Sequence, residues 1–139
     1  PDADWHPLST RERPSSRGVI NLTEADWVKV IEALKLPEGS FHFPVADTGS
    51  MDGMMDYGQD IVLVPFKDFA PYRIEDLQVG DIATYQPPGG TNLYLHRIWA
   101  IVKDEEGWRY TFWGDNNSKP DHYIVRDRQI KYLLVGIIY

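Results

Sequence analysis

The sequence predicts a mainly β fold: a mainly antiparallel β domain with a single helix at its N-terminal end. Two observations carry this prediction. From residue 41 onward, short runs of β-branched and aromatic residues alternate with glycine- and proline-containing turns, as in a sheet of short strands. Before residue 41, one stretch has apolar residues at helical spacing. The expected organisation is an extended arm over residues 1–20 and a single domain over residues 21–139.

The N-terminal part is expected to hold the arm and the helix. Residues 1–20 are mostly polar, bear prolines and show no periodicity, which is typical of an extended lead. Thr23 can cap the helix that follows, and Asp26 suits its first turn electrostatically. Its apolar residues, which we expect to face the core, are Trp27, Val30, Ile31 and Leu34. Pro37 and Gly39 end it.

Turn signals divide the rest of the chain into strands. An apolar run at 41–46 comes first. The further strands are expected at 61–64, 81–85, 93–102, 108–113 and 133–139. The segments 93–102 and 108–113, joined by residues 103–107, are typical of a hairpin. Together these segments predict a mainly antiparallel β domain.

Composition excludes several classes of function. The 139 residues suffice for one domain with a buried core, and 42% hydrophobic and 25% charged residues are typical of a soluble globular protein. A net charge of −7 gives no general attraction to phosphate backbones or anionic lipids, so we expect no nucleic-acid partner. The absence of cysteine excludes disulfides, thiolate metal sites and a cysteine nucleophile.

Metal, cofactor and membrane signals are also missing. No two of the four histidines, at 6, 42, 96 and 122, have a helical metal-ligand spacing, and the acidic string at 47, 52, 56 and 60 lacks the pattern of a calcium loop. We therefore expect neither a metal nor a cofactor. No apolar run approaches the roughly 18–20 residues of a membrane span. The chain begins at Pro1 rather than at a methionine, so we expect membrane association only through an anchor outside it. The compartment and the oligomeric state are not assigned.

One stretch, residues 47–55, is a candidate for catalysis because it can expose Ser50. A small, glycine-containing polar turn between the apolar runs 41–46 and 61–64 lets the backbone bend sharply and hold one side chain out of the packing. A serine beside a glycine is more often an ordinary turn or capping residue. Catalysis therefore requires a base and a group that orients it.

His96 is the candidate base. It lies in the expected strand 93–102, and an imidazole can accept a serine proton near neutral pH. The alternative is a half-buried structural histidine. Residues 113–121 supply two carboxylates, Asp115 and Asp121, either of which can orient the imidazole. The alternative here is an ordinary hairpin turn that Asp115 closes locally.

The order of these motifs resembles that of the signal peptidase I family, most closely its endoplasmic-reticulum and archaeal branch, which uses serine and histidine. Five short segments match in family order over about residues 43–139. They are the nucleophile box Thr48-Gly49-Ser50-Met51-Asp52, then Gly58 with 61–64, the Val-Gly-Asp-Ile strand at 79–85, the base box Leu95-His96-Arg97-Ile98, and Gly114-Asp115-Asn116-Asn117 with Asp121.

The resemblance implies a fold of the signal-peptidase and SOS-repressor-protease type and a serine endopeptidase that cleaves an extended peptide or protein segment after small residues. It assigns Ser50 as nucleophile, His96 as general base and Asp121 as the residue that orients His96. Asp115 would support the turn and assist the base. Bacterial signal peptidases and the self-cleaving SOS repressors share this fold but place a lysine where this chain has His96. The neighbouring Arg97 cannot act as a base because its charge is permanent.

The same resemblance assigns the remaining site residues. The Ser50 backbone N–H and the Thr48 hydroxyl would form the oxyanion hole, and Met51 would contribute to substrate binding. The chain departs from the family at Gly53, where a proline is usual, and at Gly58-Gln59-Asp60, where Gly and Asp are usually adjacent.

Two alternatives to a serine peptidase stay open. Asp47-Thr48-Gly49-Ser50 is also the Asp-Thr-Gly-Ser signature of retroviral-type aspartic proteases, which would use Asp47 and dimerise to pair two aspartates. This alternative leaves His96 unexplained. The other is a catalytically inactive domain of the same fold that binds peptides or proteins, as Gly53 and the lack of a membrane helix in this chain suggest.

Overall fold

In the computed structural model of the protein, the described residues are 22–45, 48–55 and 58–138. They contain one α-helix and six strands. The helix is α1, Glu24–Leu34, and the strands are β1 (Phe41–Pro44), β2 (Asp60–Pro65), β3 (Ile82–Tyr85), β4 (Tyr94–Asp104), β5 (Gly107–Trp113) and β6 (Ile130–Ile138). The expected arm over residues 1–20 lies outside the described residues, as does Asp47.

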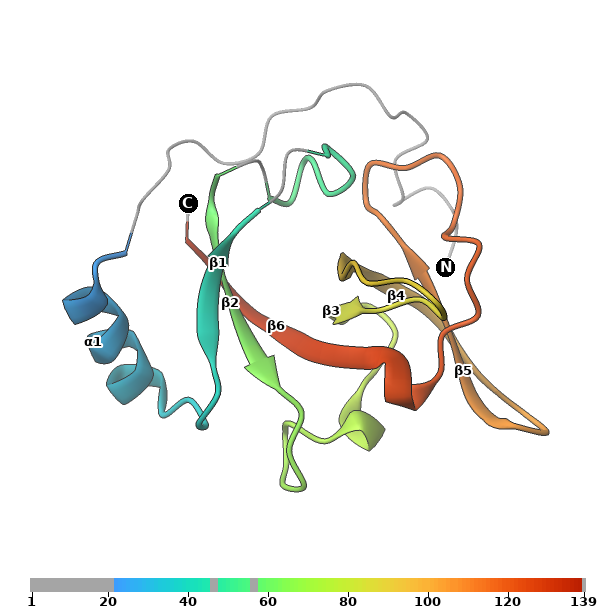
Figure 1. Ribbon diagram of the computed structural model, residues 1–139, viewed down its shortest axis with the longest axis horizontal. Helices are drawn as coiled ribbons and strands as arrows, with labels where there is room; N and C mark the ends of the chain where they lie inside the picture. The colour runs from blue at the N-terminus through green and yellow to red at the C-terminus, as the bar shows by residue number, and fades with distance from the viewer. Residues whose placement is uncertain (1–21, 46–47, 56–57, 139) are drawn as a thin grey trace.

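All six strands belong to one antiparallel sheet in the order β1-β2-β6-β3-β4-β5. The mainly β, antiparallel fold with one helix is therefore confirmed. The long, curved β6 joins the β1–β2 pair to the β3–β4–β5 part of the sheet (Figure 1). Register shifts in the pairings of β6 with β2 and β3, and of β4 with β5, bend the sheet, because a bulged strand twists more strongly than a regular one.

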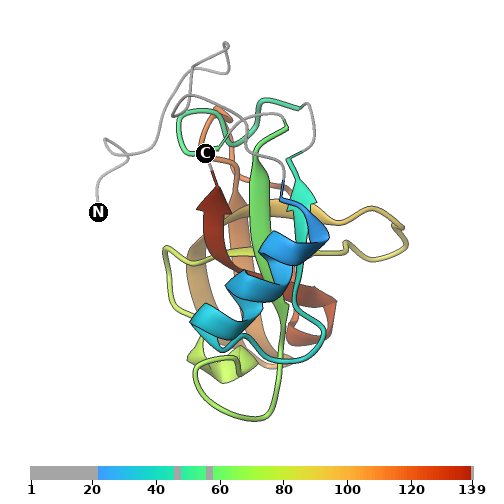
Figure 2. The same ribbon diagram turned by 90° about the vertical axis from the view of Figure 1, so that its left-hand side faces the viewer.

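Helix α1 begins as the sequence predicts and lies on the outer side of β1 (Figures 1 and 2). The Thr23 hydroxyl accepts a hydrogen bond from the Asp26 N–H, and the Asp26 carboxylate accepts one from the Thr23 N–H. The expectation for its apolar residues is met only in part. Trp27 is buried, with its ring 5.1 Å from that of His42 on β1, whereas Leu34 is exposed.

Other boundaries differ from the sequence prediction. The β4–β5 hairpin is tighter than expected, since Asp104 pairs with Gly107 and only two residues form the turn. Strand β6 begins at Ile130 rather than at residue 133. Two short 3-10 helices, η2 (Ile74–Asp76) and η3 (Asp127–Gln129), were not expected. Among the described residues, no helix is long and apolar enough to cross a membrane.

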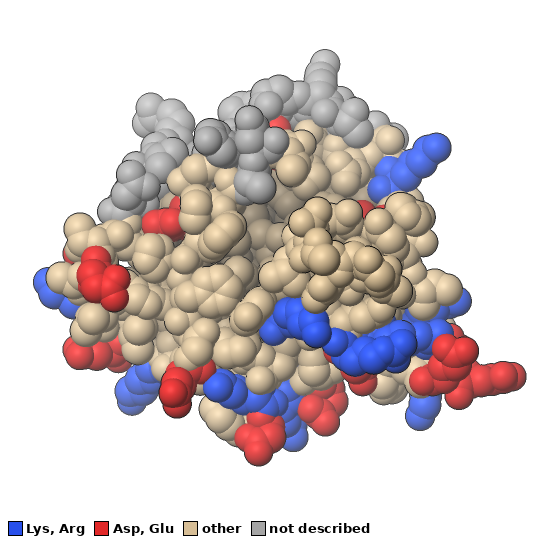
Figure 3. Space-filling view, viewed as in Figure 1, with Lys and Arg blue, Asp and Glu red and all other residues tan. Residues whose placement is uncertain are grey.

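Charge is distributed unevenly over the face of the molecule shown in Figure 3. Lysine, arginine, aspartate and glutamate side chains gather mainly toward the lower edge of this face, and its centre carries almost none (Figure 3). Both signs are interspersed along that edge. A ligand bound over the centre of this face would therefore meet mostly uncharged side chains.

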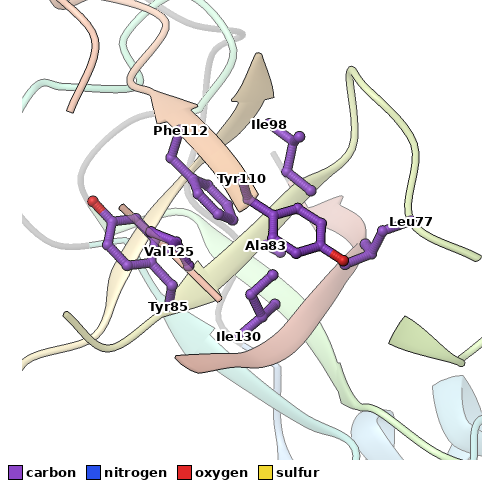
Figure 4. Packing of buried hydrophobic residues seen from close by; sticks show 8 residues of the cluster. All are labelled: Leu77, Ala83, Tyr85, Ile98, Tyr110, Phe112, Val125 and Ile130. Carbon is purple, nitrogen blue, oxygen red and sulfur yellow. The ribbon is translucent and has the colours of Figure 1, made fainter. Parts of the chain in front are cut away.

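The buried residues form two hydrophobic clusters. The larger one consists of Leu77, Ala83, Tyr85, Ile98, Tyr110, Phe112, Val125 and Ile130 (Figure 4). The smaller one consists of Met51, Met55, Ile61, Leu63 and Ile82. Met51 directly follows Ser50 in the chain and Met55 lies later in the same loop, so the smaller cluster anchors the candidate nucleophile loop to the sheet.

Candidate active site

Two loops, residues 48–55 and 114–121, lie side by side at one end of the sheet (Figures 1 and 2). Hydrogen bonds join their backbones. The Asn116 N–H donates to the Ser50 carbonyl at 2.7 Å, and the Asn116 side-chain amide donates to the Gly49 carbonyl at 3.1 Å. The Asp115 N–H lies 3.2 Å from the Met51 sulfur. The second loop therefore fixes the position of the first.

The structure brings Ser50, His96 and Asp121 together in one hydrogen-bonded chain. Ser50 Oγ lies 3.0 Å from His96 Nε2, and His96 Nδ1 lies 2.6 Å from Asp121 Oδ2. His96 is on β4, and Asp121 is held by its backbone N–H, which donates to the Phe112 carbonyl on β5 at 2.8 Å. The imidazole and the carboxylate are largely shielded from solvent, with 12% and 9% of their side-chain surfaces exposed.

The partners of the imidazole assign its protons when it is neutral. An ionised carboxylate only accepts hydrogen bonds, so Nδ1 carries the proton and donates to Asp121. Nε2 is then the acceptor for the Ser50 hydroxyl. This is the tautomer that a general base beside a serine requires.

Thr48 lies against the candidate nucleophile. Its Oγ1 is 3.2 Å from Ser50 Oγ and 3.4 Å from the Ser50 backbone nitrogen. Because the Ser50 hydroxyl donates to His96, the Thr48 hydroxyl is the donor toward Ser50 Oγ. Both groups expected to form the oxyanion hole, the Thr48 hydroxyl and the Ser50 N–H, are therefore beside the serine oxygen.

Asp115 contacts Arg97 rather than His96. Arg97 Nε and Nη2 donate to the two carboxylate oxygens at 2.9 and 2.7 Å, and Nη1 donates to the Gly80 carbonyl at 2.9 Å. The hydrogen bonds to Asp115 raise the pKa of the Arg97 guanidinium, so Arg97 stays charged. The suggested support of Asp115 for the turn fits this geometry, whereas its suggested contact with the base does not. Asp121 and Asp115 therefore bind two adjacent residues of β4, His96 and Arg97 respectively.

Met51 lies in the core. Only 4% of its surface is exposed, and it packs in the smaller cluster with Met55 and Ile61. This position leaves little surface for the substrate contact suggested by the resemblance. Met51 instead holds the loop that carries Ser50.

Sequence reasoning missed three residues that shape the site: Gly114, Asn116 and Tyr85. A Cβ atom on Gly114 would lie 2.8 Å from the Ser50 carbonyl oxygen and 3.0 Å from His96 Nε2. The Tyr85 hydroxyl donates to Asp121 Oδ2. The Gly-Asp-Asn-Asn motif marked Gly114 and Asn116 as turn residues, but nothing in the sequence connects Tyr85 on β3 with Asp121.

Within 22–45, 48–55 and 58–138, no three histidine, aspartate or glutamate side chains lie close enough together to hold a metal ion. Asp47, the residue that the aspartic-protease alternative needs, is outside these ranges.

Comparisons of the chain with models of known protein families, with curated proteins and with solved structures found no match. The resemblance to signal peptidases described above therefore stays a prediction. Support for a function must come from the geometry of the site.

Proposed function

We propose that this chain is a serine endopeptidase of the signal-peptidase type, with Ser50 as nucleophile, His96 as general base and Asp121 as the residue that orients the base. One observation carries the proposal: the serine hydroxyl, the imidazole and the carboxylate form a continuous chain of 3.0 and 2.6 Å hydrogen bonds. An ordinary turn serine bonds within its own loop. Ser50 instead bonds to a histidine 46 residues away, which in turn bonds to a carboxylate 25 residues further on.

Acylation follows from this geometry. Ser50 Oγ attacks the carbonyl carbon of the scissile peptide bond while its proton moves to His96 Nε2. The carboxylate of Asp121 stabilises the imidazolium that forms, at 2.6 Å from Nδ1. The imidazolium then gives its Nε2 proton to the leaving amine as the carbon–nitrogen bond breaks. The product is an ester of Ser50 and a free amine.

Thr48 can stabilise the charge that develops during attack. In the resting site its hydroxyl donates to Ser50 Oγ. Once that oxygen is bonded to the substrate carbon, the hydroxyl and the Ser50 N–H are free to donate to the carbonyl oxygen, which has become negative. Water then hydrolyses the ester, with His96 taking the proton of the attacking water and returning it to Ser50.

The proposed substrate is an extended segment of a peptide or protein with small residues before the scissile bond. This choice rests on the resemblance to signal peptidases. Neither a metal nor a cofactor is part of the proposed chemistry.

A peptide-library experiment tests the proposal. Wild type, Ser50→Ala and His96→Ala are incubated with a diverse peptide mixture at pH 8, and the products are identified by mass spectrometry. Wild type should cleave after small residues, and each variant should lose at least about 10³-fold in rate. Ser118→Ala and His122→Ala are matched controls, since both side chains are exposed and neighbour the site in sequence. They should retain activity.

Other outcomes would favour the alternatives. Cleavage with an acid optimum that pepstatin blocks and Ser50→Ala does not affect would indicate an aspartic protease that uses Asp47. Binding of the same peptides without cleavage by wild type would indicate an inactive peptide-binding domain. Either result contradicts the proposed function.

A further inference from the structure

Asp121 has a second partner besides the candidate base. Its Oδ2 atom accepts hydrogen bonds both from His96 Nδ1, at 2.6 Å, and from the Tyr85 hydroxyl, at 2.5 Å. Two donors on one oxygen share its negative charge. The strength with which Asp121 holds the imidazole proton therefore depends on the tyrosine.

The sheet holds Tyr85 firmly in this position. Tyr85 is on β3, fully buried, with its ring centroid 4.5 Å from that of Phe112 and 5.5 Å from that of Tyr94. Its ring packs in the larger cluster, and its hydroxyl points away from the centre of that cluster (Figure 4). A ring packed in this way has little freedom to rotate, so its hydroxyl meets Asp121 at one fixed place.

Tyr85 remains a hydrogen-bond donor over the whole working range of pH. Burial, reinforced by the hydrogen bond to Asp121 and the charge of that carboxylate, raises the pKa of the Tyr85 hydroxyl well above its usual range. The hydroxyl therefore keeps its proton and points it at Asp121.

We propose that Tyr85 is a positioning residue of the site, and that its hydrogen bond to Asp121 sets the pH range in which His96 can act as a base. This inference rests on the proposed function for its role in catalysis. The hydroxyl withdraws charge from Oδ2 and so weakens the pull of Asp121 on the imidazolium proton. Without the hydroxyl, His96 would keep its proton to higher pH and would be available as a base only in more alkaline solution.

The groups around the pair do not supply the same effect. Tyr94 lies on the His96 side, with ring centroids 6.4 Å apart. The hydrogen bond between Tyr94 and Tyr123 raises the pKa of the Tyr123 hydroxyl, so the Tyr123 hydroxyl stays neutral as well. His122 is exposed and packs on the Tyr123 ring, with the ring centroids 4.1 Å apart. The guanidinium of Arg97, the residue that follows His96 on β4, is paired with Asp115.

Tyr110 provides a matched control. It is a second buried tyrosine of the larger cluster, and its hydroxyl donates to Asp127 at 2.8 Å rather than to Asp121. Tyr85→Phe and Tyr110→Phe each remove one buried hydroxyl that is hydrogen-bonded to a carboxylate. Only the first change touches the carboxylate that binds His96.

The experiment follows the ring signals of His96 by NMR between pH 4 and 10 in wild type and both variants, with His122 assigned through His122→Ala. In Tyr85→Phe the titration midpoint of His96 should move upward by about 0.5–1 pH unit, and in Tyr110→Phe it should not move. The acid limb of the kcat/KM profile should shift by the same amount. A slowly exchanging hydroxyl proton on Tyr85 in wild type tests the hydrogen bond without any substitution.

The outcomes separate this inference from the proposed function. An unchanged or lowered midpoint in a folded Tyr85→Phe, or a rapidly exchanging Tyr85 hydroxyl proton in wild type, overturns the inference even if wild type is an active peptidase. A raised midpoint in Tyr85→Phe, together with a wild type that cleaves no peptide, supports the link from Tyr85 to His96 and refutes the peptidase.

Discussion

At the scale of single residues, Gly114 has the least room for change. A Cβ atom there would press on the Ser50 carbonyl oxygen and on His96 Nε2, at 2.8 and 3.0 Å. We expect Gly114→Ala to lower kcat/KM by about 10²-fold, because a displacement of the order of 1 Å between nucleophile and base is enough for that loss. Stability should fall by about 1–3 kcal/mol. Peptide cleavage and urea denaturation measure the two effects.

Gly136→Ala is the control for this prediction. A Cβ on Gly136 would meet Val62 at an ordinary 3.6 Å, in the pairing of β2 with β6. Its activity should equal that of wild type. Full activity in Gly114→Ala would show that the close approach in the structure does not constrain the site.

Asn116 is a second single residue that shapes the site. Its buried side chain donates to the Gly49 carbonyl and so holds the loop that carries Ser50. Asn116→Ala should destabilise the fold by about 1–3 kcal/mol, because the partly buried Gly49 carbonyl loses its partner. It should also lower kcat, because the nucleophile loop loosens. Thermal unfolding and steady-state kinetics measure both, and the exposed Asn92→Ala should change neither.

At the scale of elements, α1 is attached to the sheet mainly through one side chain. Trp27 is the buried residue of this helix, and it packs on His42 of β1. Trp27→Ala should cost about 3–5 kcal/mol of docking energy and leave α1 free to unfold locally. Hydrogen exchange should become fast in α1 and stay slow in β2 and β6.

Activity should survive this change, because β4, β5 and the two site loops hold the proposed catalytic residues. Leu34→Ala, at an exposed position of the same helix, should leave the exchange of α1 unchanged. Loss of protection throughout the sheet in Trp27→Ala would contradict a helix that unfolds by itself.

The elements also show which parts of a fold can be predicted from sequence. The capping box of Thr23 and Asp26 joins residues only three positions apart in the chain, so the start of the helix could be predicted from the sequence. The strands could be predicted from their β-branched and aromatic residues. Their order could not, because the pairing of β6 with both β2 and β3 joins segments far apart in the chain.

At the scale of the whole molecule, buried tyrosines link stability to pH. Burial raises the pKa of both Tyr85 and Tyr110. Above about pH 10 the tyrosines of the unfolded chain lose their protons while these two keep theirs, so the free energy of unfolding falls as the pH rises. Below that pH both states keep the protons, and this contribution is constant.

Tyr85→Phe should make the decrease in the free energy of unfolding with pH shallower, by up to about 1.4 kcal/mol per pH unit. Urea denaturation at a series of pH values from 9 to 11.5 measures the slope. Equal slopes for wild type and Tyr85→Phe would contradict a protonated, buried Tyr85.

The residues of the site could be predicted from the sequence only where they belong to a recognisable motif. Ser50, His96 and Asp121 come from short boxes in a family order, and the structure places them in contact. The separate partner of Asp115 could not be foreseen, because it depends on which way Arg97 points from β4. The contact of Tyr85 with Asp121 likewise requires the folded sheet, since 36 residues separate them.

If Ser50 attacks a carbonyl carbon with His96 as its base, the protein passes through an ester of Ser50. Trapping this acyl-enzyme is the sharpest test of the proposed mechanism. A peptide ester ending in alanine is mixed with the protein at pH 8, quenched in acid within seconds and examined by intact-protein and peptide mass spectrometry. We expect one acyl group on Ser50 in wild type, none in Ser50→Ala, and formation at least about 10²-fold slower in His96→Ala. Ester hydrolysis at the wild-type rate in Ser50→Ala, or an acyl group on another residue, would contradict it.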